Sequence, residues 1–147
     1  MDSLVCTSCA DKTPLASILC DVEYHGIARN LIHAVKFENA RAGTKTIARI
    51  MAQYLAPLPA HAVLVPIPTT NQRRRQRGYD QAELIARELS QLTHLPYAHL
   101  LERHGSSHQV GATRKVRAQQ ITGCFTVRRQ THAPAVVIVI DDVITTG

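Results

Sequence analysis

The chain has 147 residues, of which 45% are hydrophobic, and this is enough for one compact domain with a buried core. No apolar run reaches the roughly 20 residues that a membrane-spanning helix needs. The first residues also lack the basic-then-apolar pattern of a secretion signal, so we expect a cytoplasmic protein without membrane insertion. The formal net charge of +6 favours anionic partners, either phosphorylated small molecules or nucleic acid.

The four cysteines fall into two groups. Cys6 and Cys9 have the spacing of half a zinc knuckle, whereas a structural zinc site normally has four ligands. Two interpretations stay open for this pair, an incomplete zinc site or two idle thiols. Cys20 and Cys124 have no such spacing, and we expect them to be buried as small hydrophobic residues.

Two helices are predicted before the first strand. Residues 24–37 contain a short apolar stripe, and a second stripe with a spacing of three and four residues follows Gly43 and Thr44. Pro57 and Pro59 end the second helix.

The next segments predict strands alternating with a helix. Residues 62–68 form an apolar run without alternation, typical of a parallel strand covered on both faces. An arginine-rich loop follows, and Asp80 begins a helix in which Glu83 completes a capping box. Residues 95–101 and 125–127 are weaker strand candidates, and residues 136–140 form the clearest buried strand.

This order of elements indicates an α/β domain with a mostly parallel sheet. Ligands of such sheets collect at the carboxyl ends of the strands, where the loops after Ile67 and Ile140 are expected to lie. Residues 103–123 are polar, basic and poor in apolar side chains. A stretch of this length in a compact domain is typical of a functional or mobile loop.

The last eleven residues carry the most specific chemical pattern. A buried strand ends at Asp141 and Asp142, whose carboxylates could accept hydrogen bonds from the vicinal hydroxyls of a sugar. Beyond them, the turn Ile144-Thr145-Thr146-Gly147 offers backbone N–H groups and two hydroxyls to a phosphate. The alternative, an acidic cap that merely leads into a turn, does not need Thr-Thr-Gly at that place.

This segment resembles the phosphoribosyl diphosphate (PRPP) loop of type I phosphoribosyltransferases. The resemblance implies that the acid pair holds the ribose 2- and 3-hydroxyls and that the Thr-Thr-Gly turn holds the 5-phosphate. It makes the whole segment the candidate ribose and phosphate site, namely Asp141, Asp142, Val143, Ile144, Thr145, Thr146 and Gly147.

A wider resemblance covers nearly the whole chain. The motifs Val63-Leu64-Val65-Pro66-Ile67-Pro68 and Arg77-Gly78-Tyr79-Asp80-Gln81-Ala82 resemble those of the competence protein F (ComF) family. Gln109, Arg117 and Phe125, spaced by eight residues, and the upstream pairs Leu31-Ile32 and Lys36-Phe37 fit the same family.

The resemblance to this family implies a three-layer, Rossmann-like fold of the type I phosphoribosyltransferase kind. It places a diphosphate beside the candidates Pro66, Ile67, Pro68, Arg73, Arg77 and Gly78. It also places Gln109 and Arg117 on a loop that closes over the substrate. Guanidinium groups suit a diphosphate because they bind phosphoryl oxygens in a bidentate manner.

The family pattern also implies domain boundaries. Its members begin with two Cys-x-x-Cys pairs that form a zinc ribbon, and they continue beyond the PRPP loop into a helix. We therefore expect residues 1–22 to be the remnant of a zinc-ribbon-like segment. Residues 23–147 are expected to form a phosphoribosyltransferase-like domain that is incomplete after the PRPP loop, in a chain truncated at both ends.

Two functional hypotheses follow. In the first, the domain binds PRPP, or another ribose 5-phosphate ligand such as a nucleotide, with Mg²⁺, and transfers the phosphoribosyl group to an acceptor that the sequence does not identify. In the second, it is a non-catalytic adaptor in DNA uptake that senses a nucleotide or contacts single-stranded DNA and its machinery. No side chain stands out as a general base, so turnover stays an open question.

Overall fold

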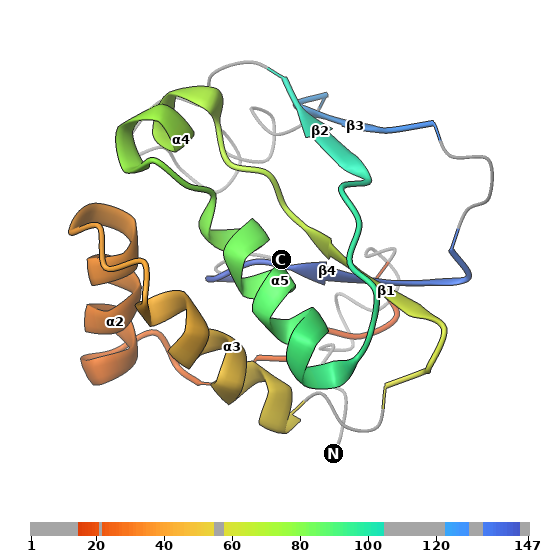
Figure 1. Cartoon of the computed structure of the whole chain (residues 1–147), viewed down its shortest axis with the longest axis horizontal. Coiled ribbons are helices and arrows are strands. Elements are labelled where there is room, and N and C mark those ends of the chain that lie inside the picture. Colours follow the sequence, from red (N-terminus) through yellow and green to blue (C-terminus); the bar gives the residue numbers. More distant parts are fainter. Residues whose placement is uncertain (1–14, 21, 55–57, 105–122, 130–133, 145–147) are drawn as a thin grey trace, which may run out of the picture.

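The computed structural model describes residues 15–20, 22–54, 58–104, 123–129 and 134–144. In chain order its elements are α2 (Gly26–Phe37), α3 (Gly43–Tyr54), β1 (Ala62–Pro66), α4 (Asn71–Arg77), α5 (Gln81–Thr93), β2 (Leu101–Arg103), β3 (Phe125–Val127) and β4 (Val136–Ile140). Figure 1 shows α3 and α5 side by side next to the β1–β4 pair, with β2 and β3 forming a separate pair. The predicted mixed α/β class is therefore confirmed.

The sheet formed by β1 and β4 is parallel, in line with the prediction, and a second two-stranded sheet is antiparallel. β1 and β4 pair in parallel over their full lengths, from Ala62 opposite Val136 to Pro66 opposite Ile140. Leu64 also forms a parallel bridge with Tyr97, whereas β2 and β3 are antiparallel. The strand predicted at residues 95–101 is thus reduced to this bridge. Pro96 contributes to the shortening because it has no N–H to donate to a ladder.

The hydrophobic core lies between the sheet and the helices. α5 contacts β1 and β4, α3 packs against α5, and α2 packs against α3. The largest fully buried side chains come from these elements and their connections, namely Leu64, Ile85, Leu89, Ile140, Val35 and Val65. Gly43 is required where α2 and α3 approach, because a Cβ there would lie 2.7 Å from Cγ2 of Val35.

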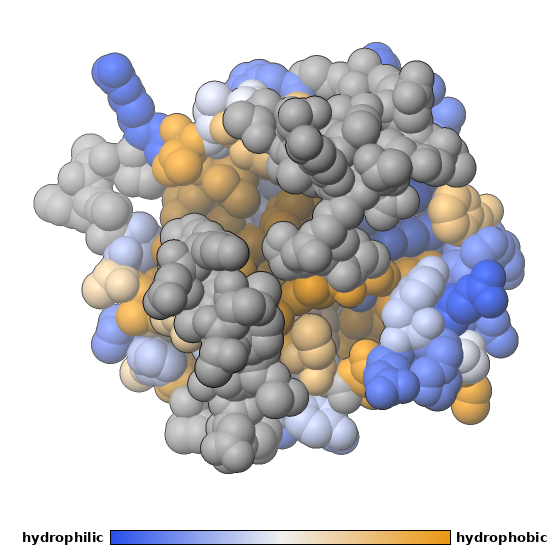
Figure 2. Space-filling view, turned by 180° about the vertical axis from the view of Figure 1, so that it is seen from behind, coloured by the Kyte–Doolittle hydropathy of each residue, from blue (hydrophilic) through white to orange (hydrophobic). Residues whose placement is uncertain are grey.

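Residues 136–140 form a strand, as predicted, but it is buried on one face only. Val136 and Ile138 pack against the core and Ile140 is buried, but Val137 and Val139 are 43% and 45% exposed. A run of apolar residues does not show which face of a strand is covered, and α5 covers one face of this one. Seen from behind, hydrophobic residues form much of the surface between the segments drawn in grey (Figure 2).

The arginine-rich segment is a short helix, not the loop that we predicted. The hydroxyl of Thr70 caps α4 by accepting from the backbone N–H of Arg73, at 3.2 Å. Gly78 ends the helix in the left-handed region, with φ of 77° and its N–H bonded to the carbonyl of Arg74. Glycine suits this position because side chains are disfavoured there.

Asp80 begins α5, as predicted, although the capping box is one-sided. Its Oδ1 accepts from the N–H groups of Ala82 and Glu83, at 3.1 and 3.4 Å, whereas the carboxylate of Glu83 lies 3.6 Å from His99.

The expectation that Cys20 and Cys124 are buried is wrong, because Cys20 is exposed and Cys124 is only partly buried. Among the described helices, none is long and apolar enough to cross a bilayer.

Candidate functional site

The loops after β1 and β4 meet at the same edge of the sheet, as predicted. The N–H of Ile67 donates to the carbonyl of Ile140 at 3.0 Å, which places the start of the first loop beside Asp141. Oδ2 of the buried Asp80 accepts from the N–H of Thr69 at 2.7 Å. The same carboxylate that caps α5 therefore holds the loop after β1 in place.

A polar pocket of about 350 Å³ opens at this edge, and we call it the central pocket. Its wall combines the end of α2, the loop after β1, the helices α4 and α5, the end of β2 and the residues after β4. The lining residues are Lys36, Ile67, Pro68, Thr69, Arg73, Gln81, Arg103, Asp141, Asp142 and Val143. Acidic groups from one strand and basic groups from several other elements thus surround one volume.

Asp142 forms an ion pair that is largely withdrawn from water. Its Oδ1 lies 2.9 Å from Nζ of Lys36, and the two side chains are 5% and 21% exposed. Its Oδ2 is buried and has no hydrogen-bond partner among the described residues. A buried carboxylate oxygen is normally satisfied, so Oδ2 is an acceptor that no described residue uses.

Asp141 has an unusual protonation equilibrium. Burial, and then the neighbouring charge of Asp142, raise its pKa from 3.8 to about 6. The backbone N–H of Asp142, which donates to Oδ1 of Asp141 at 2.8 Å, and the charge of Lys36 oppose this rise. The free site therefore holds two crowded carboxylates, and a cationic or hydrogen-bonding ligand would relieve their repulsion.

Arg103 faces these carboxylates from the end of β2. Its guanidinium lies 5.1 Å from the ring centroid of Phe125 and 3.5 Å from the carbonyl of Pro68, and its Nε is buried without a partner among the described residues. Burial, and then the positive charge of Arg73, lower its pKa. An incoming anion would compensate both effects.

Sequence reasoning overlooked Arg103 and Lys36 as site residues. Each had a signal: Arg103 opens the long basic stretch at the end of a candidate strand, and Lys36 belongs to a pair that fits the family pattern. Neither signal shows that Lys36 pairs with Asp142 or that Arg103 lines the same pocket as the acid pair. These placements join segments about a hundred and about forty residues apart in the chain.

The structure brings together part of the predicted site. Ile67, Pro68, Arg73, Asp141, Asp142 and Val143 line the central pocket. Four others lie near it without lining it: Pro66 at the end of β1, Gly78 in the turn after α4, Ile144, which is half exposed, and Arg77. Arg77 donates to Oε1 of Gln81 at 2.9 Å, and burial followed by the charge of Arg73 lowers its pKa.

The remaining predicted residues lie outside the described ones. They are the ribose-phosphate candidates Thr145, Thr146 and Gly147, the loop candidates Gln109 and Arg117, and the cysteine pair Cys6 and Cys9. Within the described ranges, no group of three or more His, Cys, Asp or Glu side chains could hold a metal ion.

Two curated proteins are similar to this chain. Competence protein F of Haemophilus influenzae is 31% identical over 129 residues, which cover 80% of this chain and 56% of that protein. Competence protein ComFC of Bacillus subtilis is 32% identical over 88 residues, or 59% of this chain and 34% of that protein. The matched part thus spans about half or less of each relative. No family model and no solved structure matches the chain.

Proposed function

Because the chain belongs to the competence protein F (ComF) family, we propose that its central pocket binds phosphoribosyl diphosphate with Mg²⁺, on a type I phosphoribosyltransferase-like fold. One observation carries this proposal. The acid pair that follows β4 shares a pocket with Arg73 of α4 and Arg103 of β2. A sugar diol and a diphosphate need these two kinds of partner at a short separation.

The pocket suits such a ligand in size and charge. Its volume of about 350 Å³ lies within the range of roughly 300–1,000 Å³ that small-molecule sites occupy. The carboxylates of Asp141 and Asp142 would accept from the ribose hydroxyls, and the guanidiniums of Arg73 and Arg103 would bind phosphoryl oxygens. Arg103 is suited to this because its guanidinium is partly buried and its Nε has no partner among the described residues.

The donor set also fits Mg²⁺, which prefers oxygen ligands and usually keeps several waters beside substrate phosphates. Oδ2 of Asp142 and the carboxylate of Asp141 would hold the hydrated ion, directly or through water. When bound, Mg²⁺ would neutralise part of the diphosphate charge.

For group transfer, this arrangement supplies position and electrostatics instead of a protein nucleophile. Arg73 and Arg103 would stabilise the departing diphosphate, and the carboxylates would hold the ribose and lie near the positive charge that develops on its ring. We therefore propose phosphoribosyl transfer as the reaction that this pocket supports.

Calorimetric titration with PRPP and Mg²⁺ tests the binding step. We expect saturable binding that is lost in the double variant Asp141→Asn/Asp142→Asn. Arg73→Gln should weaken binding by about tenfold or more, because a charge-assisted hydrogen bond contributes about 1.5–3 kcal/mol. The matched control is Arg75→Gln on the same helix, an exposed residue outside the pocket, which should change the affinity less than about twofold. Equal losses in both arginine variants, or no binding by folded protein, would refute the proposal.

A second candidate function rests on a different surface. Arg74 and Arg75 of α4 are exposed and do not line the central pocket. Both relatives are named competence proteins. We propose that these arginines contact single-stranded DNA. The affinity for an oligonucleotide should then fall steeply with salt, and Arg74→Gln/Arg75→Gln should flatten the slope. No binding at low salt would reject this function.

A further inference from the structure

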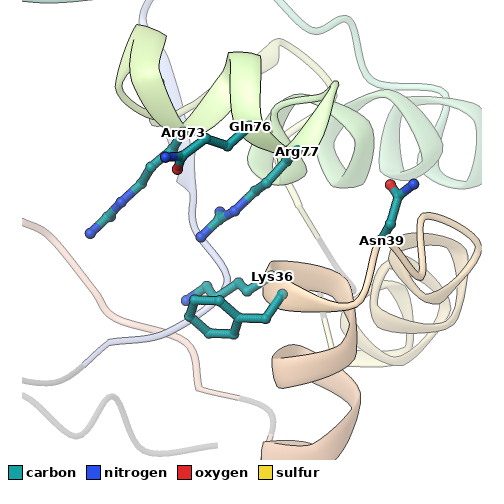
Figure 3. A pocket seen from close by; sticks show the side chains of 6 residues that line it. Lys36, Asn39, Arg73, Gln76 and Arg77 are labelled. Atoms are coloured by element: carbon teal, nitrogen blue, oxygen red, sulfur yellow. The ribbon is translucent and has the colours of Figure 1, made fainter.

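A second hollow of about 250 Å³ lies beside the central pocket, and we call it the side pocket. It is enclosed by the end of α2 with the turn that follows and by one side of α4. The lining residues are Lys36, Phe37, Asn39, Arg73, Gln76 and Arg77. Figure 3 shows the side chains of Arg73 and Arg77 descending from α4 toward the end of α2, which carries Lys36.

The two pockets share part of their walls. Lys36 and Arg73 line both of them. Arg77 lines the side pocket and donates to Gln81, which lines the central one. A ligand in the side pocket would therefore lie next to a ligand in the central pocket, with cationic groups between them.

The wall of the side pocket is held in place by buried contacts. The hydroxyl of Tyr79, itself buried, donates to the carbonyl of Val35 and so ties the turn after α4 to the last turn of α2. The chain then turns at Asn39, whose φ of 56° lies in the left-handed region that asparagine tolerates better than most residues. Phe37 is thus presented on a fixed helix end, although its side chain is 69% exposed.

The chemistry of the wall selects a particular kind of ligand. Lys36, Arg73 and Arg77 are cationic, and none of the lining residues is acidic. The amides of Asn39 and Gln76 each offer a donor and an acceptor to the edge of a ring. The ring of Phe37 is contacted by the guanidinium of Arg77, 5.5 Å above its centroid, and by the ring of His33, 4.9 Å away, yet Phe37 stays 69% exposed. The exposed part of this ring and the flat guanidinium offer surfaces on which a planar group stacks.

We propose that the side pocket binds an anionic planar heterocycle, a ring of nucleobase type that carries a carboxylate. A phosphate group alone would leave Phe37 and the two amides unused, and a neutral base would leave the cations uncompensated. The volume, below the roughly 300 Å³ at which sites for drug-sized ligands begin, suits one ring system and not a whole nucleotide.

This ligand would be the phosphoribosyl acceptor, a role that rests on the function proposed above. In the transfer, a ring nitrogen forms a bond to C1 of the ribose with its lone pair. The bond from C1 to the diphosphate oxygen breaks, and diphosphate leaves with that electron pair. An attacking nitrogen that carries a proton, as in a pyrimidine, loses it to solvent, whereas a pyridine nitrogen carries none and becomes a pyridinium. The products are the N-phosphoribosylated heterocycle and diphosphate.

Binding can be tested apart from turnover. Orotate (a pyrimidine with a carboxylate) and nicotinate (a pyridine with a carboxylate) are titrated calorimetrically into the full chain, and uracil serves as the pyrimidine without the carboxylate. Each titration is repeated with ribose 5-phosphate and Mg²⁺ present, which cannot react. We expect at least one of the two acids to bind saturably, and uracil to bind at least about tenfold more weakly, because uracil lacks the carboxylate that the cationic side chains would attract.

Variants locate the site. Gln76→Glu places a negative charge in the side pocket and should weaken binding of the acid by about tenfold. Its matched control is Gln72→Glu, the same change at an exposed position of α4 that lines neither pocket, which should have an effect below about twofold. Phe37→Ala should also weaken binding about tenfold, because it removes the ring on which the heterocycle stacks.

The outcomes separate this inference from the proposed function. If neither acid binds, if uracil binds as well as orotate, or if Gln76→Glu and Gln72→Glu behave alike, the inference is overturned, whatever PRPP does. If an acid binds as described while PRPP does not bind, the side pocket stands and the proposed function fails.

Discussion

Replacing Asp141 by asparagine should stabilise the free protein while removing its function. The pKa of this carboxyl rises from 3.8 to about 6 on folding, because burial and the charge of Asp142 disfavour the ionised form. At about 1.4 kcal/mol per pKa unit, keeping Asp141 ionised in the folded state opposes folding by up to about 3 kcal/mol above pH 6. The asparagine side chain would carry no charge and would keep an oxygen that can accept from the N–H of Asp142.

The raised pKa of Asp141 also determines how the free energy of unfolding changes with pH. Between pH 3.8 and 6 the folded state binds more protons than the unfolded one, so the free energy of unfolding decreases as pH rises through this window. Asp141→Asn should therefore raise the free energy of unfolding by about 1–3 kcal/mol at pH 7.5. The gain should shrink toward zero by pH 4, where Asp141 is protonated in the folded state and pH is close to its unfolded pKa of 3.8.

Urea unfolding of the wild type and of Asp141→Asn at pH 7.5 and at pH 4 measures the gain in the free energy of unfolding and its decrease at the lower pH. The matched variant Asp142→Asn should behave in the opposite way, because it removes the buried partner of Lys36 and should destabilise the protein by about 1–3 kcal/mol at pH 7.5. If Asp141→Asn is neutral or destabilising at pH 7.5, or if its effect does not depend on pH, the reasoning about the crowded acid pair is wrong.

Further predictions concern the contacts that shape the pockets. Gly78→Ala should destabilise the protein by about 1–2 kcal/mol, because φ is 77° there, and thermal unfolding would show this as a lower Tm. Tyr79→Phe should lower the free energy of unfolding by about 1–3 kcal/mol, since the carbonyl of Val35 loses a buried partner; an unchanged urea midpoint would contradict the contact. Arg103→Gln should weaken Mg-PRPP binding about tenfold or more in calorimetry without destabilising the fold, because its partly buried guanidinium would bind the diphosphate and its Nε has no partner among the described residues. Mg-PRPP affinity should also fall as pH decreases through about 6, where Asp141 becomes protonated, and a flat profile from pH 7.5 to 5 would contradict its role as an acceptor.

Much of the fold could be predicted from periodicity and turn chemistry. The stripe that ends at Phe37, the cap at Asp80 and the two β-branched runs identified α2, α5, β1 and β4 because each signal is local. Two predictions failed for physical reasons. The arginine run of α4 has no apolar stripe to reveal a helix, and its cap, Thr70, is a common loop residue. The exposure of Val137 and Val139 depends on which face α5 covers, and this is not encoded within β4 itself.

In the candidate site, too, some residues could be assigned from local patterns, whereas contacts between distant segments could not. The acid pair and the loop after β1 could be assigned because the chain order of an α/β sheet brings both to one edge. The contact of Lys36 with Asp142, and the approach of Arg103 to Pro68, depend on tertiary packing between distant segments. The side pocket was not predicted at all, because its two walls, α2 and α4, show no shared pattern in the sequence.

Amide chemical-shift mapping with PRPP and Mg²⁺ on the isotope-labelled chain tests the central claim most directly, because it reports both binding and its place. We predict saturable shifts at Thr69, Asp142 and Val143 around the central pocket, and none in the half of α5 farthest from Gln81. The same shifts should be absent in Asp141→Asn/Asp142→Asn. Saturable shifts centred elsewhere, or a folded wild-type spectrum that PRPP leaves unchanged, would contradict the account.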